Sequence, residues 1–207
     1  MISERAAAAW RGPFLRFEPM IRVLAAIAGL LALAPEARAE RRGPVRSLVE
    51  LRQERVVRQG WDLSCGAAAL STLLTHDLGY PVSEAEIVAG ILDSEDAAKV
   101  KRRGGFTLLD LKKFVVRRGH EAAGYGNLTL ATLAPLAPAI VATEHRGQPH
   151  FMVFRGIHED RVLLADPAFG NRTMRKDRFE AIWKPRVAFV VKAAPPAAPV
   201  AAAGGGR

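Results

Sequence analysis

Cysteine is almost absent from this sequence: the 207-residue chain contains one, Cys65. A single cysteine excludes an internal disulfide, so the thiol is a reactive group, an intermolecular link or a buried passenger. The same scarcity argues against a zinc site, because one cysteine and dispersed histidines offer no ligand spacing. We therefore expect neither a metal nor a cofactor, and any chemistry has to come from ordinary side chains.

Long hydrophobic runs are missing as well. The apolar run at 23–34 is about a dozen residues long, whereas a membrane-spanning helix needs roughly 20. It follows Arg22 and precedes Ala37-Arg38-Ala39, which is the order of parts in a secretory signal peptide. We expect 1–39 to be a cleaved signal, with Met20 as an alternative start, or else an uncleaved anchor. A cleaved signal predicts a periplasmic protein without a membrane span.

Acidic residues are outnumbered, since 21 Asp and Glu against 30 Lys and Arg give a formal charge of +9. Such a balance favours acidic partners: anionic lipid or lipopolysaccharide surfaces, acidic peptides, or nucleic acid. The basic residues are scattered, however, and no aromatic residues interleave with them in a base-stacking pattern. We therefore expect a solvated basic surface and no nucleic-acid partner.

The middle of the chain has the composition of one folded domain. With 49% hydrophobic residues overall, the chain can form a single domain of about 100–200 residues with a real core. Residues 193–207 are almost entirely Ala, Pro, Val and Gly without periodicity, which predicts a disordered tail. We assign the folded domain to 40–192.

Periodicity predicts helices first and strands afterwards. Apolar residues at three- and four-residue spacing predict helices at 65–78, from Ser83 onward, and at 107–119. The second half predicts a strand at 139–142, a hairpin of 151–157 with 161–165, a helix at 175–183 and a strand at 187–191. We also expect a leading strand within 46–58 and a basic loop at 99–105. This order is typical of an α+β fold.

Cys65 stands where a polar segment meets the first apolar helix. A helix N-terminus carries partial positive charge, which favours the thiolate and makes the sulfur a nucleophile. His150 and Asp166 follow later, in Pro-His-Phe-Met-Val-Phe and Leu-Ala-Asp-Pro. A cysteine, a histidine and an aspartate in this order match papain-like cysteine peptidases, in which the cysteine opens a helix and the histidine lies on a strand.

Four motifs occur in a specific order between residues 45 and 191. They are Gln59 with Cys-Gly-Ala-Ala-Ala-Leu at 65–70, then Gly-Gly-Phe-Thr-Leu-Leu-Asp-Leu-Lys, Pro-His-Phe-Met-Val-Phe and Asp-Pro-Ala-Phe-Gly. Together they resemble the double-glycine leader peptidases, family 39 of the cysteine peptidases. The resemblance implies a papain-like α+β fold with N-terminal helices packed on a C-terminal antiparallel sheet. It also implies a cysteine endopeptidase that cleaves a secreted peptide or protein after a Gly-Gly-type leader.

The resemblance gives each site residue a role. Cys65 is expected to attack the scissile carbonyl, and His150 to pair with the thiolate and protonate the leaving amine. Asp166 is expected to hold the imidazole in the right tautomer. Gln59 is expected to donate its amide to the oxyanion, together with the Cys65 backbone N–H. His145 is the rival base.

The chain also departs from the family pattern. Ser64 stands where many members carry Asp before the cysteine, and we expect it or Asp62 to cap the helix. The sequence has no nucleotide-binding Gly-x-x-x-x-Gly-Lys-Ser/Thr loop. Stand-alone exported relatives resemble accessory proteins of secretion systems, including functional-amyloid secretion, so a secretion-system component is an expected partner. Two alternatives stay open: a non-cleaving peptidase-like binding or chaperone module, and another thiol chemistry such as acyl transfer or cell-wall amidase action.

Overall fold

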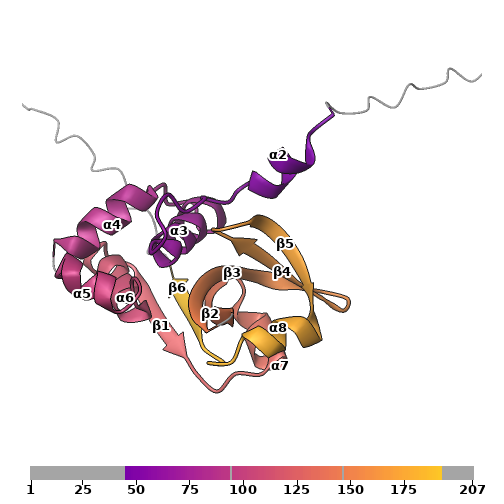
Figure 1. Ribbon diagram of the computed structural model, residues 1–207. Helices are drawn as coiled ribbons and strands as arrows, with labels where there is room; N and C mark the ends of the chain where they lie inside the picture. The colour runs from indigo at the N-terminus through magenta and orange to yellow at the C-terminus, as the bar shows by residue number, and fades with distance from the viewer. Residues whose placement is uncertain (1–44, 94, 146, 193–207) are drawn as a thin grey trace, which may run out of the picture. The chain divides into compact units, whose positions relative to one another are not determined.

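The computed structural model describes residues 45–93, 95–145 and 147–192 (Figure 1). The expected signal at 1–39 and the expected tail at 193–207 lie outside the described residues. From Arg46 onward the described residues belong to one compact unit. Within that part of the chain, no helix is both long and apolar enough to cross a membrane.

The first half of the unit is helical. Its elements are α2 (Leu48–Gln53), α3 (Cys65–Thr72), the π-helical turn η1 (Leu73–Asp77) that continues α3, α4 (Glu84–Leu92), α5 (Ala97–Arg102) and α6 (Leu108–Arg117). Reciprocal capping boxes start α4, through Ser83 and Glu86, and α6, through Thr107 and Asp110. The predicted helix starts at Ser83 and Thr107 are therefore confirmed.

Two predicted segments are wrong, and local capping explains both. The expected leading strand within 46–58 contains α2 instead, because Ser47 and Glu50 form a third capping box. The expected basic loop at 99–105 begins inside α5, whose start is capped by Asp96 through the Ala98 N–H. In both places a short polar cap starts a helix that the apolar pattern does not indicate.

The second half forms a six-stranded antiparallel sheet in the order β1-β6-β2-β3-β4-β5. Its elements in chain order are β1 (Glu121–Tyr125), α7 (Leu130–Leu133), η2 (Ala134–Leu136), β2 (Ala139–His145), β3 (Gln148–His158), β4 (Arg161–Asp166), β5 (Gly170–Arg175), α8 (Lys176–Ile182) and β6 (Ala188–Lys192). The predicted hairpin of β3 and β4 is confirmed. The edge strand β5 is not predicted by the sequence pattern.

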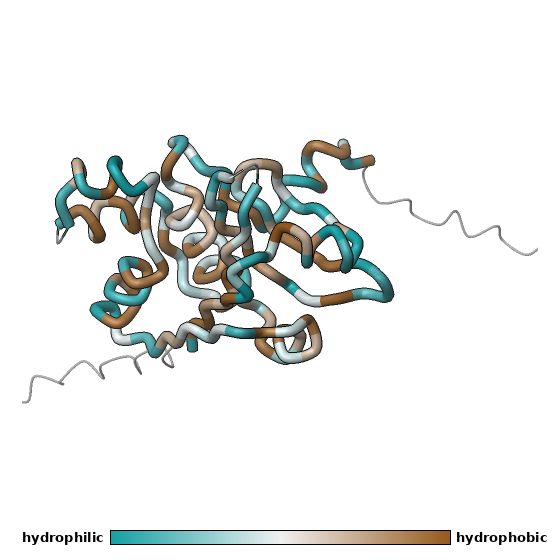
Figure 2. The backbone as a smooth tube through the Cα atoms, turned by 60° about the horizontal axis from the view of Figure 1, so that its bottom comes forward, coloured by the Kyte–Doolittle hydropathy of each residue, from teal (hydrophilic) through white to brown (hydrophobic). Residues whose placement is uncertain are grey.

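Hydrophobic side chains pack on both faces of the sheet. Along β3, Val153 joins a core built mainly from α3, α4 and α6, while Met152 and Phe154 join a second core with Phe179 and Trp183 of the α8 region. Figure 1 shows α3 to α6 gathered on one side of the sheet and α7 and α8 on the other, and Figure 2 shows hydrophobic stretches of chain through the interior. The result is the expected α+β arrangement, with β3 and β4 between two cores.

Candidate active site

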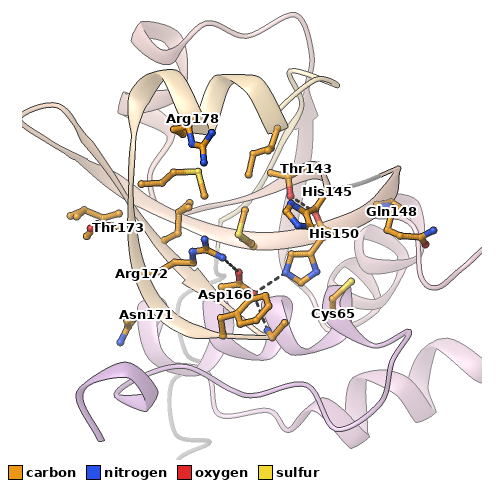
Figure 3. Close-up of a pocket in the computed structure, with 18 of the residues that line it drawn as sticks. Cys65, Thr143, His145, Gln148, His150, Asp166, Asn171, Arg172, Thr173 and Arg178 are labelled. Carbon is orange, nitrogen blue, oxygen red and sulfur yellow. Dashed lines mark hydrogen bonds and ion pairs between the residues drawn. The ribbon is translucent and has the colours of Figure 1, made fainter. Parts of the chain in front are cut away.

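Cys65, His150 and Asp166 line one cleft of about 1720 Å³ (Figure 3). Cys65 is the first residue of α3, His150 lies near the start of β3, and Asp166 is the last residue of β4. The three predicted residues are thus brought together from one helix and two neighbouring strands.

A close approach of α3 to β3 sets the distance between cysteine and histidine. Gly66 follows Cys65 and Phe151 follows His150, and a Cβ at Gly66 would lie 3.2 Å from the Phe151 ring. Because Gly66 has no side chain, the start of α3 can approach β3 closely. This contact places the thiol beside the imidazole.

His150 and Asp166 form a direct hydrogen bond: His150 Nε2 lies 2.8 Å from Asp166 Oδ1. The Asp166 side chain is 1% exposed and that of His150 is 21% exposed, so water competes little for this contact. With Nε2 held by the carboxylate, the other ring nitrogen is the one that can face the Cys65 sulfur. Figure 3 shows the Cys65 and His150 side chains next to each other.

The pKa of the Cys65 thiol is lowered from its ordinary value. Burial raises this pKa, but hydrogen bonds from His150 and from the Phe151 and Gly66 backbone N–H groups, with the charge of His150, lower it by more. The sulfur is therefore a thiolate at a lower pH than a free cysteine.

The pKa of His150 moves the other way, to about 9. Burial lowers this pKa, but the hydrogen bonds to Asp166 and Cys65 and the negative charges of both groups raise it by more. The pKa of Asp166 is lowered: burial raises it, while the His150 hydrogen bond and charge, the Ala168 N–H and Arg172 lower it by more. The site thus favours a thiolate, an imidazolium and a carboxylate in a row.

Arg172 is a further contributor that the sequence analysis did not single out. Its Nη1 donates to Asp166 Oδ2 at 3.1 Å, while the Ala168 N–H donates to Oδ1 at 2.9 Å. Arg172 comes from the unpredicted strand β5, where it lies opposite Leu164 of β4. The only sequence signal was its place in the basic stretch 172–178, which does not reveal the register.

Gln59 lies on the loop before α3, but its amide is engaged within that loop. Gln59 Nε2 donates to the Trp61 carbonyl at 3.0 Å. Its Oε1 is buried and, among the described residues, has no hydrogen-bond partner. The Gln59 backbone N–H and Arg58 Nε both donate to the Pro167 carbonyl at 3.0 Å. The loop is therefore tied to the turn after Asp166, and the oxyanion role of Gln59 stays a prediction.

Glu84 of α4 braces the same loop. Its two carboxylate oxygens accept from the Gly60 N–H at 3.1 and 3.0 Å, and the residue is 9% exposed. Ser64 occupies the N-cap position of α3 without a side-chain cap hydrogen bond, so the cap expected from Ser64 is absent. Its Oγ instead donates to the Trp61 carbonyl and accepts from the Trp61 N–H. Ser64 thus shapes the loop rather than capping the helix.

The rival base His145 also lines the cleft, from the end of β2. The ring bonded to the Asp166 carboxylate, however, is that of His150. Among the described residues, no group of three or more His, Cys, Asp or Glu side chains could hold a metal ion. The chemistry that the described cleft supports is that of a thiol activated by an imidazole.

Sequence comparison finds a matching family model and several similar proteins, of which two are described below. A family model described as the Peptidase C39 family matches residues 53–195. A probable functional amyloid protease FapD of Pseudomonas fluorescens is 38% identical over 141 residues, covering 67% of this chain and 61% of that protein. The protein of that name in Pseudomonas aeruginosa is 37% identical over 148 residues, covering 71% and 65%. The chain therefore spans less than two thirds of the length of these relatives.

Solved structures show the same fold. The peptidase domain of Streptococcus ComA, a bifunctional ABC transporter involved in quorum sensing, matches with a TM-score of 0.56 at 22% identity, covering 67% of this chain and 98% of that one. A double-glycine motif protease from an AMS/PCAT transporter, solved with its leader peptide, matches with a TM-score of 0.55 at 23% identity, covering 67% and 91%. The α+β, papain-like fold expected from the motifs is confirmed.

Proposed function

The chain belongs to the peptidase C39 family, and from that premise we propose that it is a cysteine endopeptidase that uses Cys65, His150 and Asp166. The observation that carries the proposal is the position of His150, which lies beside Cys65 in the cleft and is hydrogen-bonded through Nε2 to Asp166. The opposite pKa shifts of thiol and imidazole favour an ion pair that is ready to attack a carbonyl.

In the acylation half-reaction, the Cys65 thiolate adds to the scissile carbonyl carbon and the carbonyl oxygen becomes an oxyanion. The His150 imidazolium then gives its proton to the leaving amine as the C–N bond breaks, which leaves a thioester on Cys65. The raised pKa of His150, about 9, keeps that proton available at neutral pH.

In the deacylation half-reaction, neutral His150 removes a proton from water, and the resulting hydroxide attacks the thioester. The carboxylic acid leaves, Cys65 returns as the thiolate and His150 as the imidazolium. Asp166 stays ionised throughout and holds the ring through Nε2, while Arg172 and the Ala168 N–H hold the carboxylate.

Gln59 is proposed as an oxyanion donor together with the Cys65 backbone N–H. This role requires the Gln59 amide to exchange its contact with the Trp61 carbonyl for one with the substrate oxyanion. Removing one oxyanion donor typically costs about 100- to 1,000-fold in kcat. A loss of that size in Gln59→Ala, with the fold intact, is the expected outcome.

The proposed substrate is a secreted peptide or protein cut after a Gly-Gly-type sequence. The support comes from the relatives: one matching structure is a double-glycine motif protease with a leader peptide, and two relatives are probable functional amyloid proteases. The signal-like composition of 1–39 supports a periplasmic location and action within a secretion system. Fractionation of cells that express the tagged full chain tests the location.

The test of the activity uses reduced protein and peptides that end in a fluorogenic amide after either Gly-Gly or Ala-Ala. We expect release of the fluorophore after Gly-Gly, its loss in Cys65→Ala and in His150→Ala, and its retention in His145→Ala. Equal release by Cys65→Ala would overturn the proposal. Binding of the peptide without release by the reduced wild type would instead indicate the non-cleaving module.

A further inference from the structure

The cleft that contains the site extends beyond Cys65, along β5 and α8, and its lining is unusually basic. Two acidic residues line it, Asp62 and Asp166. Against them stand six arginines, Arg52, Arg155, Arg161, Arg172, Arg175 and Arg178. The register of β4 and β5 places Arg172 on the face of the sheet that carries Asp166, and Arg161 and Arg175 on the opposite face. The positive charge nearest the site therefore comes from Arg172 and, on α8, Arg178.

Some of these charges are already neutralised by the protein. Arg172 is bonded to Asp166, Arg155 lies 3.2 Å from Asp77, and Arg175 lies 3.1 Å from Asp177. These arginines are occupied in holding the fold and the site together. They add to the potential of the cleft, but their carboxylate partners offset much of their charge.

Arg178 differs from them. It lies on α8 and is exposed, and within the described part of the chain its guanidinium has no hydrogen bond or ion pair. Figure 3 shows Arg178 reaching from α8, and Arg172 from β5, into the same cleft. A guanidinium with five donors and no partner, on the wall of a basic cleft, is suited to bind a carboxylate.

The surface between α8 and the sheet is apolar. Met174 and Ile182, both partly buried, line this part of the cleft, whereas Met152 and Leu164 are almost inaccessible core residues. A bound chain therefore meets apolar contacts and positive charge together. That combination favours a peptide segment that carries both acidic and apolar side chains.

We propose that this part of the cleft binds an acidic segment of the peptide substrate, with Arg178 as the residue that recognises its carboxylate. The proposal rests on the peptidase function and adds a substrate class to it. A peptide fits better than a nucleic acid, because Phe169 is the one Phe, Tyr or Trp residue in the described lining and the Arg172 guanidinium lies 5.5 Å from its ring centroid. Sequence-tolerant nucleic-acid sites depend on several free stacking surfaces.

The test measures binding in the Cys65→Ala full chain, so that cleavage cannot interfere. Two fluorescein-labelled peptides share one sequence of Leu, Ser and Gly and differ only at several positions, which hold Glu in one and Gln in the other. Fluorescence anisotropy gives both dissociation constants at low and at high salt. Lys112→Gln is the matched control, because Lys112 is an exposed cation on α6 that does not line the cleft.

We expect the Glu peptide to bind more tightly than the Gln peptide, with the difference shrinking at high salt. Arg178→Gln should weaken binding of the Glu peptide about fivefold, the effect of one exposed ion pair, and leave the Gln peptide unchanged. Lys112→Gln should change neither. Equal affinities for the two peptides, an unchanged Arg178→Gln, or more effective competition by a single-stranded oligonucleotide than by the Glu peptide would each overturn the inference.

The outcomes separate this inference from the proposed function. A charge preference that depends on Arg178, in a protein that releases no fluorophore, would refute the peptidase and keep the binding site. Cleavage that depends on Cys65, without any preference for the Glu peptide, would support the peptidase and refute the acidic-segment site.

Discussion

Asp166 is held by Arg172 from the side opposite His150: Arg172 Nη1 lies 3.1 Å from Asp166 Oδ2, while His150 Nε2 lies 2.8 Å from Oδ1. Both oxygens of one nearly inaccessible carboxylate are thus used, so the group cannot rotate without losing a partner. Arg172 therefore acts as a positioning residue for the proposed catalytic histidine.

Replacing Arg172 tests that relationship. Arg172→Gln should raise the pKa of Asp166, because Arg172 is one of the groups that lower it, and so move the acidic limb of the pH–rate profile upward. We expect kcat/KM to fall about tenfold, the size of effect seen when a group that orients a metal-bound histidine is removed in other proteins. Arg172→Lys should keep part of the activity. A merely structural role would lower the unfolding free energy and leave the acidic limb in place.

The ionisation of Cys65 can be measured directly. Since its pKa is lowered, alkylation by iodoacetamide should reach half its maximal rate at a lower pH than for an unperturbed cysteine, whose pKa is about 8.5. His150→Ala should shift that midpoint upward, because burial, which raises the pKa, then acts without the imidazolium. His145→Ala should leave it unchanged. If the midpoint were the same in the wild type and in His150→Ala, Cys65 would be a buried cysteine without a catalytic role.

The pH dependence of catalysis should reflect His150. Its imidazolium protonates the leaving amine, so activity should persist through neutral pH and fall as the pH rises through about 9. Asp166→Asn removes the largest cause that raises this pKa, and the alkaline limb should then move toward about 6.5. The rate should also fall by about 10⁴-fold. An alkaline limb that stays in place would remove Asp166 from the proposed triad.

Glu84 should matter through the loop that it braces. Glu84→Ala leaves the Gly60 N–H without its acceptor, which should cost about 1–3 kcal/mol of unfolding free energy in urea titrations. Glu84→Gln keeps an acceptor and should cost less. Because Gln59 precedes Gly60, Glu84→Ala should also lower kcat. Equal stability of the two variants would show that this hydrogen bond contributes little.

Two adjacent glycines form a matched pair. A Cβ at Gly105, where φ is +128°, would lie 2.9 Å from the Leu63 carbonyl oxygen, whereas a Cβ at Gly104, where φ is +80°, meets nothing within 4 Å. Gly104→Ala should cost about 1–2 kcal/mol from backbone strain alone. Gly105→Ala should cost more and also lower kcat, because Leu63 lies close before Cys65. Equal costs, measured by thermal unfolding, would contradict the assignment.

The sequence predicted those features that depend on local chemistry. Ser83 and Thr107 start helices because each has an acidic residue three positions later, and the β3–β4 hairpin follows from two apolar runs around a polar turn. Ser47 also has an acidic residue, Glu50, three positions later, but the irregular apolar pattern of 46–58 predicts a strand there and masks the capping box.

The site was predicted as far as order along the chain allows. Cys65, His150 and Asp166 do line one cleft, but Arg172 could not be found, since its contact depends on the register of a strand without an apolar signature. The hydrogen bond of the Gln59 amide to Trp61 was also beyond prediction. Side-chain partners within a loop depend on three-dimensional packing and not on spacing.

Two hydrogen bonds join the loop before Cys65 to the turn after Asp166. Arg58 and Gln59 both donate to the Pro167 carbonyl, and Arg58 is 109 positions away from it along the chain. Contacts that close so long a loop form late in folding, because closing the loop costs chain entropy before the contact contributes any stability. Until then Cys65 is an ordinary thiol. The proposed Cys65–His150 ion pair therefore requires the folded chain.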